Sequence, residues 1–258
     1  MMNLKQNTGL FGPSLRIMDI TGIGLQRKNV GYKVFMSMTI AVTVYVFTAL
    51  YELWLLRGKL EEALHNASIT IVGVMVSLKC ASLIYRQERW RQLISGLSRL
   101  EFNILCENDV TSKAIIGDYI KYLRMLGYVY AILVFGTNAT FISQPLLKFA
   151  SAEYRSRLSN GTATYQNIFS SWYPFDKTKP PGYWVSVVVE VFVNLYGGLI
   201  ITVFDVNVVA VMVFMKGHIQ ILKHKCQSIF GNLDGIVTER EAEARIKECS
   251  IYHTSLLK

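Results

Sequence analysis

Three ionisable side chains stand well inside long apolar stretches of the 258-residue sequence, more than five residues from either end, and they are its first candidates for chemistry. Lys79 lies in one stretch, whereas Glu190 and Asp205 share another. A charged group within an apolar helix is costly, so it commonly pairs with an opposite charge, lines a watery path or relays protons. We favour structural pairing, or an ammonium group that reaches back to the end of its helix, for Lys79. A proton or ion relay through the two acids is the alternative.

Other residues with chemical potential do not form a recognisable site. His218, His224 and Cys226 lie close together, but their spacing is poor for a metal and no second ligand pair follows. The four cysteines are scattered and form no C-x-x-C motif, which argues against a zinc site or a disulfide framework. We therefore predict a protein that is not an enzyme and that has no metal site and no cofactor.

The composition indicates which elements carry the three ionisable residues. Hydrophobic residues make up 52% of the sequence and charged residues only 17%, against about 25% in ordinary globular proteins. The mean hydropathy is +0.31. Such a chain has too few charges for a soluble surface and is too apolar to be disordered. The net charge of +9 is distributed between the apolar stretches, so it favours a lipid bilayer over a nucleic acid as partner.

Four apolar stretches reach the roughly 20 residues that a membrane-spanning helix requires. As a helix, the last of them would be about 50 Å long, so in a bilayer core of roughly 30 Å it must tilt, kink or continue into water. The pair Gly197-Gly198 offers a point for a bend, and a re-entrant hairpin of two half-spans is the alternative. The sequence thus predicts an all-α polytopic membrane bundle with transmembrane helices at 34–56, 67–85, 122–147 and 183–215.

The connecting segments predict further helices. Residues 86–105 and 216–230 place apolar side chains at helical spacing with basic residues between them. We expect each to continue the preceding transmembrane helix into water as an amphipathic extension. Residues 239–258 are typical of one more helix, and the turn residues in 231–235 precede it.

A cytosolic N-terminus agrees best with the polar segments. In that orientation, residues 1–33, 86–121 and 216–258 are cytosolic, and residues 148–182 form an extracellular loop. Lysine and arginine counts decide little, because their densities are nearly equal on the two sides. The glycosylation sequon at Asn160 supports the orientation, since its modification would place 148–182 outside the cell.

Several motifs resemble those of the insect odorant receptors, and they follow one another in the same order. Each motif is weak alone, but together they run through the whole chain. They are Leu15-Arg16-Ile17-Met18 near the N-terminus, Trp172-Tyr173-Pro174-Phe175-Asp176 in the loop, Asp205 late in the fourth stretch, Gln220-Ile221-Leu222, and Cys249-Ser250-Ile251-Tyr252-His253.

The resemblance implies a seven-span plasma-membrane protein with a cytosolic N-terminus, which forms a tetrameric cation channel gated directly by odorant. It implies a tuning subunit that binds a small volatile apolar ligand. This subunit assembles with a shared olfactory co-receptor into a heterotetramer, mainly through cytosolic helices. Since the sequence ends at Lys258, spans five to seven of the pattern are missing. We therefore expect a fragment without the pore helix.

A pocket for such a ligand would be apolar with one or two polar groups. The outer halves of the second, third and fourth stretches offer side chains that share a helix face. The alternative for each residue is ordinary packing against another helix or lipid. The candidate ligand-binding residues are Ile69, Val72, Gly73, Val76, Val134, Thr137, Phe141, Trp184, Val188 and Phe192.

Two other functions stay open. An insect gustatory receptor would have the same architecture, although the Trp-Tyr-Pro-Phe-Asp loop favours the odorant branch. A complete four-span scaffold or small transporter is the second alternative. However, the loop 148–182 lacks the cysteines of a tetraspanin-like scaffold. A transporter would favour paired broken helices.

Overall fold

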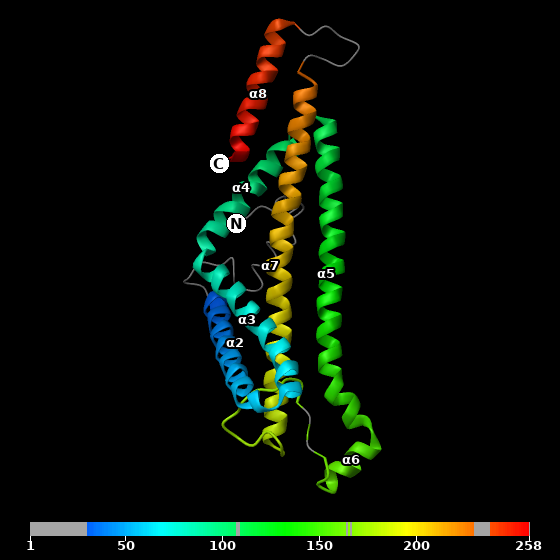
Figure 1. The fold of residues 1–258 in the computed structure, drawn as a ribbon. Helices are drawn as coiled ribbons and strands as arrows, with labels where there is room; N and C mark the ends of the chain where they lie inside the picture. Colours follow the sequence, from blue (N-terminus) through cyan, green and yellow to red (C-terminus); the bar gives the residue numbers. More distant parts are fainter. Residues whose placement is uncertain (1–29, 107–108, 164, 166, 230–237, 258) are drawn as a thin grey trace. The chain divides into compact units, whose positions relative to one another are not determined.

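The computed structural model describes residues 30–106, 109–163, 165, 167–229 and 238–257. The predicted all-α fold is confirmed, because the regular elements in this part of the chain are all helical (Figure 1). Residues 1–29, with the N-terminal motif, and the predicted turn at 231–235 lie outside the described residues. The helices are α2 (Val30–Leu55), α3 (Leu60–Tyr85), α4 (Gln87–Cys106), α5 (Val110–Ala150), α6 (Ala152–Ser159), α7 (Gly182–Gln227) and α8 (Glu239–Leu257), with the short 3-10 helix η2 (Leu56–Gly58) between α2 and α3.

Four of these helices, α2, α3, α5 and α7, are long and apolar enough to cross a membrane. They contain the four apolar stretches of the sequence. α7 continues as one helix through Gly197 and Gly198 to Gln227. The fourth stretch is therefore a single helix that runs on beyond its apolar part, and the alternative of two half-spans is wrong.

The segment after α3 differs from the expectation of one continuous extension. α3 ends at Tyr85, and α4 begins as a separate helix at Gln87. Between them Arg86 has φ −103° and ψ 18°, outside the α-helical values, while its N–H still donates to the Ser82 carbonyl. The sequence did not predict this break, because neither glycine nor proline lies at Arg86 and the helical spacing of apolar residues continues on both sides.

The chain divides into two compact units, and α5 and α7 contribute to both. Within the described residues, the bundle unit comprises 30–91 and 128–206, and the α8 unit comprises 92–127 and 207–257. In the bundle unit, α2 and α3 pack against each other (Figure 1). α2 buries one side, on which residues recur every three or four positions, namely Phe35, Thr39, Val42, Val46 and Ala49.

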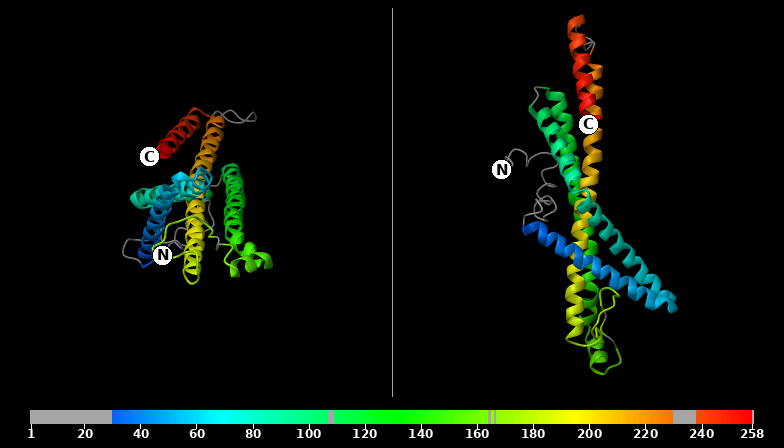
Figure 2. Two further views of the ribbon diagram at one scale, coloured as in Figure 1. Left: turned by 60° about the horizontal axis from the view of Figure 1, so that its bottom comes forward. Right: turned by 90° about the vertical axis from the view of Figure 1, so that its left-hand side faces the viewer.

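In the α8 unit, α8 runs back along the end of α7 (Figure 2). Lys225 forms an ion pair with Glu248 at 2.7 Å, and His218 Nδ1 shares a hydrogen bond with the Tyr252 hydroxyl at 2.5 Å. The two contacts show that the helices are antiparallel. Beside them α4, α5 and α7 form a small apolar core from Ile104, Ile116 and Ile221.

Candidate ligand-binding site

A cavity of about 480 Å³ lies inside the bundle unit. Side chains of α2, α3, α5 and α7 form its wall, and residues 169–171 of the segment before α7 complete it. The described residues that line it are mainly apolar, and none of them carries a charge. A mainly apolar cavity of this size with a few polar groups is typical of a small-molecule site.

The structure brings seven of the ten sequence-predicted residues to this cavity and leaves three away from it. Trp184, Val188 and Phe192 are 45%, 66% and 43% exposed and do not line it. The seven lining residues are Ile69, Val72, Gly73 and Val76 on α3, and Val134, Thr137 and Phe141 on α5.

α7 faces the cavity with a different stripe, which contains Asn194, Gly197 and Gly198. Successive residues are about 100° apart around a helix, so this stripe adjoins the predicted one. The prediction chose large apolar side chains, whereas the cavity exists where side chains are small. A Cβ atom at Gly197 would lie 3.7 Å from Val76 Cγ2, and one at Gly198 would collide with the Asn138 amide.

The prediction also missed the contributions of α2 and of the segment before α7. Tyr45, Phe169 and Ser171 line the cavity. Their positions depend on contacts far apart in the sequence, so helical periodicity carries no signal for them. A polar residue within an apolar stretch would have been a usable signal, since Asn138 in the stretch 122–147 is buried in the cavity wall.

Glu190 anchors the segment that completes the cavity. Its side chain is fully buried. Its carboxylate accepts hydrogen bonds from the backbone N–H of Ile168 at 2.8 Å and of Phe169 at 3.1 Å, and from the Tyr173 hydroxyl at 3.2 Å. Burial and the negative charge of Glu190 raise the pKa of Tyr173, so its phenol stays protonated and donates.

The same segment is tied to α2. The Ser171 hydroxyl donates to the Tyr45 hydroxyl at 2.7 Å, and Lys177 pairs with Glu52 at 2.9 Å. Lys177 also donates to the Ser171 carbonyl at 2.6 Å. The Trp-Tyr-Pro-Phe-Asp motif is thus held on both α2 and α7. Upstream in the same connection, the sequon residue Asn160 follows α6 and is exposed.

A polar cluster joins α3, α5 and α7 on another side of the cavity. Lys79 Nζ lies 2.6 Å from Asp205 Oδ1, and the Tyr130 hydroxyl donates to Asp205 Oδ2 at 2.6 Å. The structure therefore pairs the lysine and one acid that the sequence analysis singled out. Each of the three residues lies one helical turn from a residue of the cavity wall, namely Val76, Val134 and Ile201.

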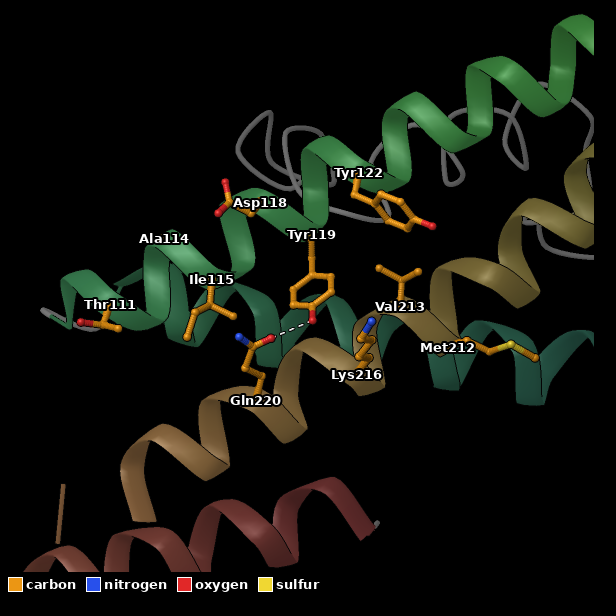
Figure 3. Close-up of a pocket in the computed structure, with 10 residues that line it drawn as sticks. All are labelled: Thr111, Ala114, Ile115, Asp118, Tyr119, Tyr122, Met212, Val213, Lys216 and Gln220. Atoms are coloured by element: carbon orange, nitrogen blue, oxygen red, sulfur yellow. Dashed lines mark hydrogen bonds between the residues drawn. The ribbon is translucent and has the colours of Figure 1, made fainter. Parts of the chain in front are cut away.

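A second hollow, of about 590 Å³, lies between α5 and α7 in the α8 unit (Figure 3). Tyr119 points across it and donates a hydrogen bond to Gln220 at 2.7 Å. Its lining includes Lys216 and Asp118, whose side chain is 82% exposed. Charged, water-exposed walls suit a neutral apolar molecule poorly, so the bundle cavity is the better candidate.

Long apolar helices around an internal cavity with an uncharged described lining define a polytopic helical membrane protein. The model of the 7tm odorant receptor family matches residues 59–258, and the chain belongs to this family. No curated protein matches the sequence.

The solved structures that share the fold include two of one receptor. They are the insect olfactory receptor OR5 from Machilis hrabei in complex with eugenol, with a TM-score of 0.64, and the same receptor described without eugenol, with a TM-score of 0.60. Both are 18% identical to the chain, and they cover 96% and 94% of it. The chain in turn spans 64% and 63% of their lengths, less than two thirds.

Proposed function

We propose that the bundle cavity binds a small, neutral, mainly apolar odorant. The observation that carries the proposal is the cavity itself, which is uncharged along its described lining and of suitable volume for such a molecule. Membership of the odorant receptor family supports the same function. The related Machilis hrabei structure contains eugenol, which is a small aromatic molecule of the expected class.

The chain acts, in this proposal, as a tuning subunit of a heteromeric ligand-gated cation channel in olfactory neurons. It lies in the plasma membrane with a cytosolic N-terminus, and the α8 unit contacts the olfactory co-receptor. Exposure of Asn160 agrees with glycosylation of the segment before α7 on the extracellular side. Tagging both ends of the chain and probing Asn160 with a glycosidase in cells tests this orientation.

Filling the cavity tests the binding function. Gly197→Leu places a large side chain in the wall, where even a Cβ already meets Val76. Gly136→Leu on α5 is the matched control, because Gly136 has nothing within 4 Å of its added Cβ and does not line the cavity. We expect eugenol to bind the purified chain in lipid nanodiscs, and Gly197→Leu to weaken its affinity at least tenfold.

Gly136→Leu should leave that affinity within twofold of the original. The proposal fails if eugenol and a panel of other small neutral odorants do not bind, or if both variants bind them as the original chain does. Thermal unfolding of each variant shows whether the helices still assemble.

A further inference from the structure

Two asparagine side chains in the cavity wall have amide N–H groups without a hydrogen-bond acceptor among the described residues. They are Asn66 on α3 and Asn138 on α5. The two residues are 2% and 8% exposed, so water does not replace the missing acceptor freely. A buried donor without an acceptor is unfavourable, and native structures leave few of them.

Three of the hydroxyl groups in the same wall already donate their protons to other groups of the protein. Thr70 and Thr137 each donate to a carbonyl oxygen one turn earlier in their own helix, at 2.8 Å. Ser171 donates to Tyr45 at 2.7 Å. These three hydroxyl protons are therefore not free for a ligand, whereas the amide N–H groups of Asn66 and Asn138 have no acceptor among the described residues.

The absence of charge and the presence of unpaired donors in the described wall restrict the chemical class of the ligand further. A ligand with a full charge would find no opposite charge among the described lining residues. A pure hydrocarbon would leave the N–H groups of Asn66 and Asn138 unpaired. The last torsion of an asparagine side chain is soft, so either amide can turn its nitrogen toward an oxygen in the cavity.

We infer that the cavity selects neutral ligands with an oxygen acceptor, such as a ketone, an aldehyde or an ester, and that Asn66 and Asn138 recognise this oxygen. The inference rests on the proposed function and names the ligand class of the same site. The hydrogen bond that links α5 and α7 at this point runs from the Asn194 side chain to the backbone carbonyl of Asn138, so it does not use the Asn138 amide group.

A pair of ligands of nearly equal shape isolates the oxygen. 2-Heptanone and 2-methyl-1-heptene differ by the exchange of a carbonyl oxygen for a CH₂ group. Each is titrated into the purified chain in nanodiscs, and the affinity is taken from the rise in thermal unfolding temperature. We expect the ketone to bind about tenfold more tightly than the alkene, because the ketone can accept one hydrogen bond from a buried donor and a tenfold affinity difference corresponds to the net free energy of such a bond.

Variants assign this preference to the two amides. Asn66→Leu and Asn138→Leu keep the approximate shape and remove the donors. Thr43→Val is the control, because the Thr43 hydroxyl donates to the Thr39 carbonyl and Thr43 does not line the cavity. The double leucine variant should bring the ketone-to-alkene ratio within twofold of one, and Thr43→Val should preserve it. Each compound also partitions into the lipid of the nanodiscs, which changes its apparent affinity. This change is the same for the variant and the original chain, so it cancels when their ketone-to-alkene ratios are compared.

Stability separates recognition from a structural role. If the amides serve the ligand, the leucine variants without ligand should unfold at the same or a higher temperature, because an unpartnered polar group has been replaced. Equal binding of ketone and alkene to the original chain overturns the inference and leaves the cavity function intact, and this readout needs no variant. Absence of binding by these compounds and by eugenol overturns the proposed function as well.

Discussion

Glu190 and Asp205 are two acids on the same helix and in the same unit, yet they are stabilised in different ways. Glu190 is fully buried and accepts hydrogen bonds from neutral donors, two of which are backbone N–H groups. The Asp205 side chain is 31% exposed and pairs with the ammonium group of Lys79. The first arrangement attaches a non-helical segment to the bundle, and the second joins neighbouring helices.

The difference shows that an acid in an apolar helix does not by itself indicate transport. Both carboxylates have their oxygens occupied by donors that position other parts of the chain. Their surroundings therefore support the structural interpretation over a proton relay. The kind of partner also predicts how each site responds to substitution, which the following variants test.

Removal of the Glu190 carboxylate should have the largest effect. Glu190→Leu leaves the N–H groups of Ile168 and Phe169 without their acceptor, and we expect a loss of about 3 kcal/mol in stability. Ligand affinity should fall as well, because Ser170 and Ser171 would leave the cavity wall. Thermal unfolding and eugenol binding in nanodiscs measure both effects.

Glu153→Gln is the control for that variant. The Glu153 side chain is 73% exposed and pairs only with Arg157 of its own helix among the contacts seen, so its loss should cost less than about 0.5 kcal/mol. Equal losses for the two variants would contradict the role assigned to Glu190.

Removal of one member of the ion pair should rank second. Lys79→Met leaves Asp205 with Tyr130 alone, and we expect a loss of about 2 kcal/mol, since the pair is only partly exposed. The double variant Lys79→Met, Asp205→Leu should be more stable than Lys79→Met, because it no longer buries an unpaired charge. Thermal unfolding of the two variants measures this difference. If the double variant is less stable than the single one, the unpaired charge of Asp205 does not explain the loss.

The weaker partner of Asp205 should matter less. Tyr130→Phe removes one hydrogen bond of 2.6 Å but keeps the ion pair and the aromatic ring, so we expect a loss of about 1 kcal/mol. Tyr128→Phe is the matched control on the same helix, because Tyr128 is 70% exposed. Unfolding temperatures that are indistinguishable for the two variants would remove Tyr130 from the cluster.

The ion pair between Lys177 and Glu52 should give the smallest effect. Their side chains are 28% and 15% exposed, much as in the pair of Lys79 and Asp205, but Lys177 lies outside the membrane-spanning helices, so water can solvate Glu52 when the lysine is removed. Lys177→Ala should therefore cost about 0.5 to 1 kcal/mol, including the hydrogen bond to Ser171. High salt should reduce the difference between variant and original chain, because it screens exposed charges. Thermal unfolding at about 0.1 M and 1 M salt measures this, and a difference that grows with salt would argue against an electrostatic contribution.

The sequence predicted the long helices because their signal is local. Continuous apolar runs of spanning length led directly to α2, α3, α5 and α7. The break at Arg86 was not predictable in the same way, since amphipathic spacing continues on its far side and no glycine or proline interrupts it.

The cavity was predictable only in part, for a related reason. Periodicity identified the faces of α3 and α5 that line the cavity, because these faces carry apolar residues of medium size. It could not identify the face of α7 around Gly197, where the absence of side-chain volume creates the space. Nor could it place Ser171 beside Tyr45, since that contact joins residues 126 positions apart.

The attachment of residues 168 and 169 through their peptide groups has a consequence for how this receptor can change over generations. Every amino acid except proline supplies the N–H that Glu190 binds. Phe169 lines the cavity, and it can be replaced by other residues without loss of the backbone hydrogen bond to Glu190. In the proposed function, a substitution at Phe169 changes the ligand preference of the cavity while the attachment of the segment to Glu190 stays as it was.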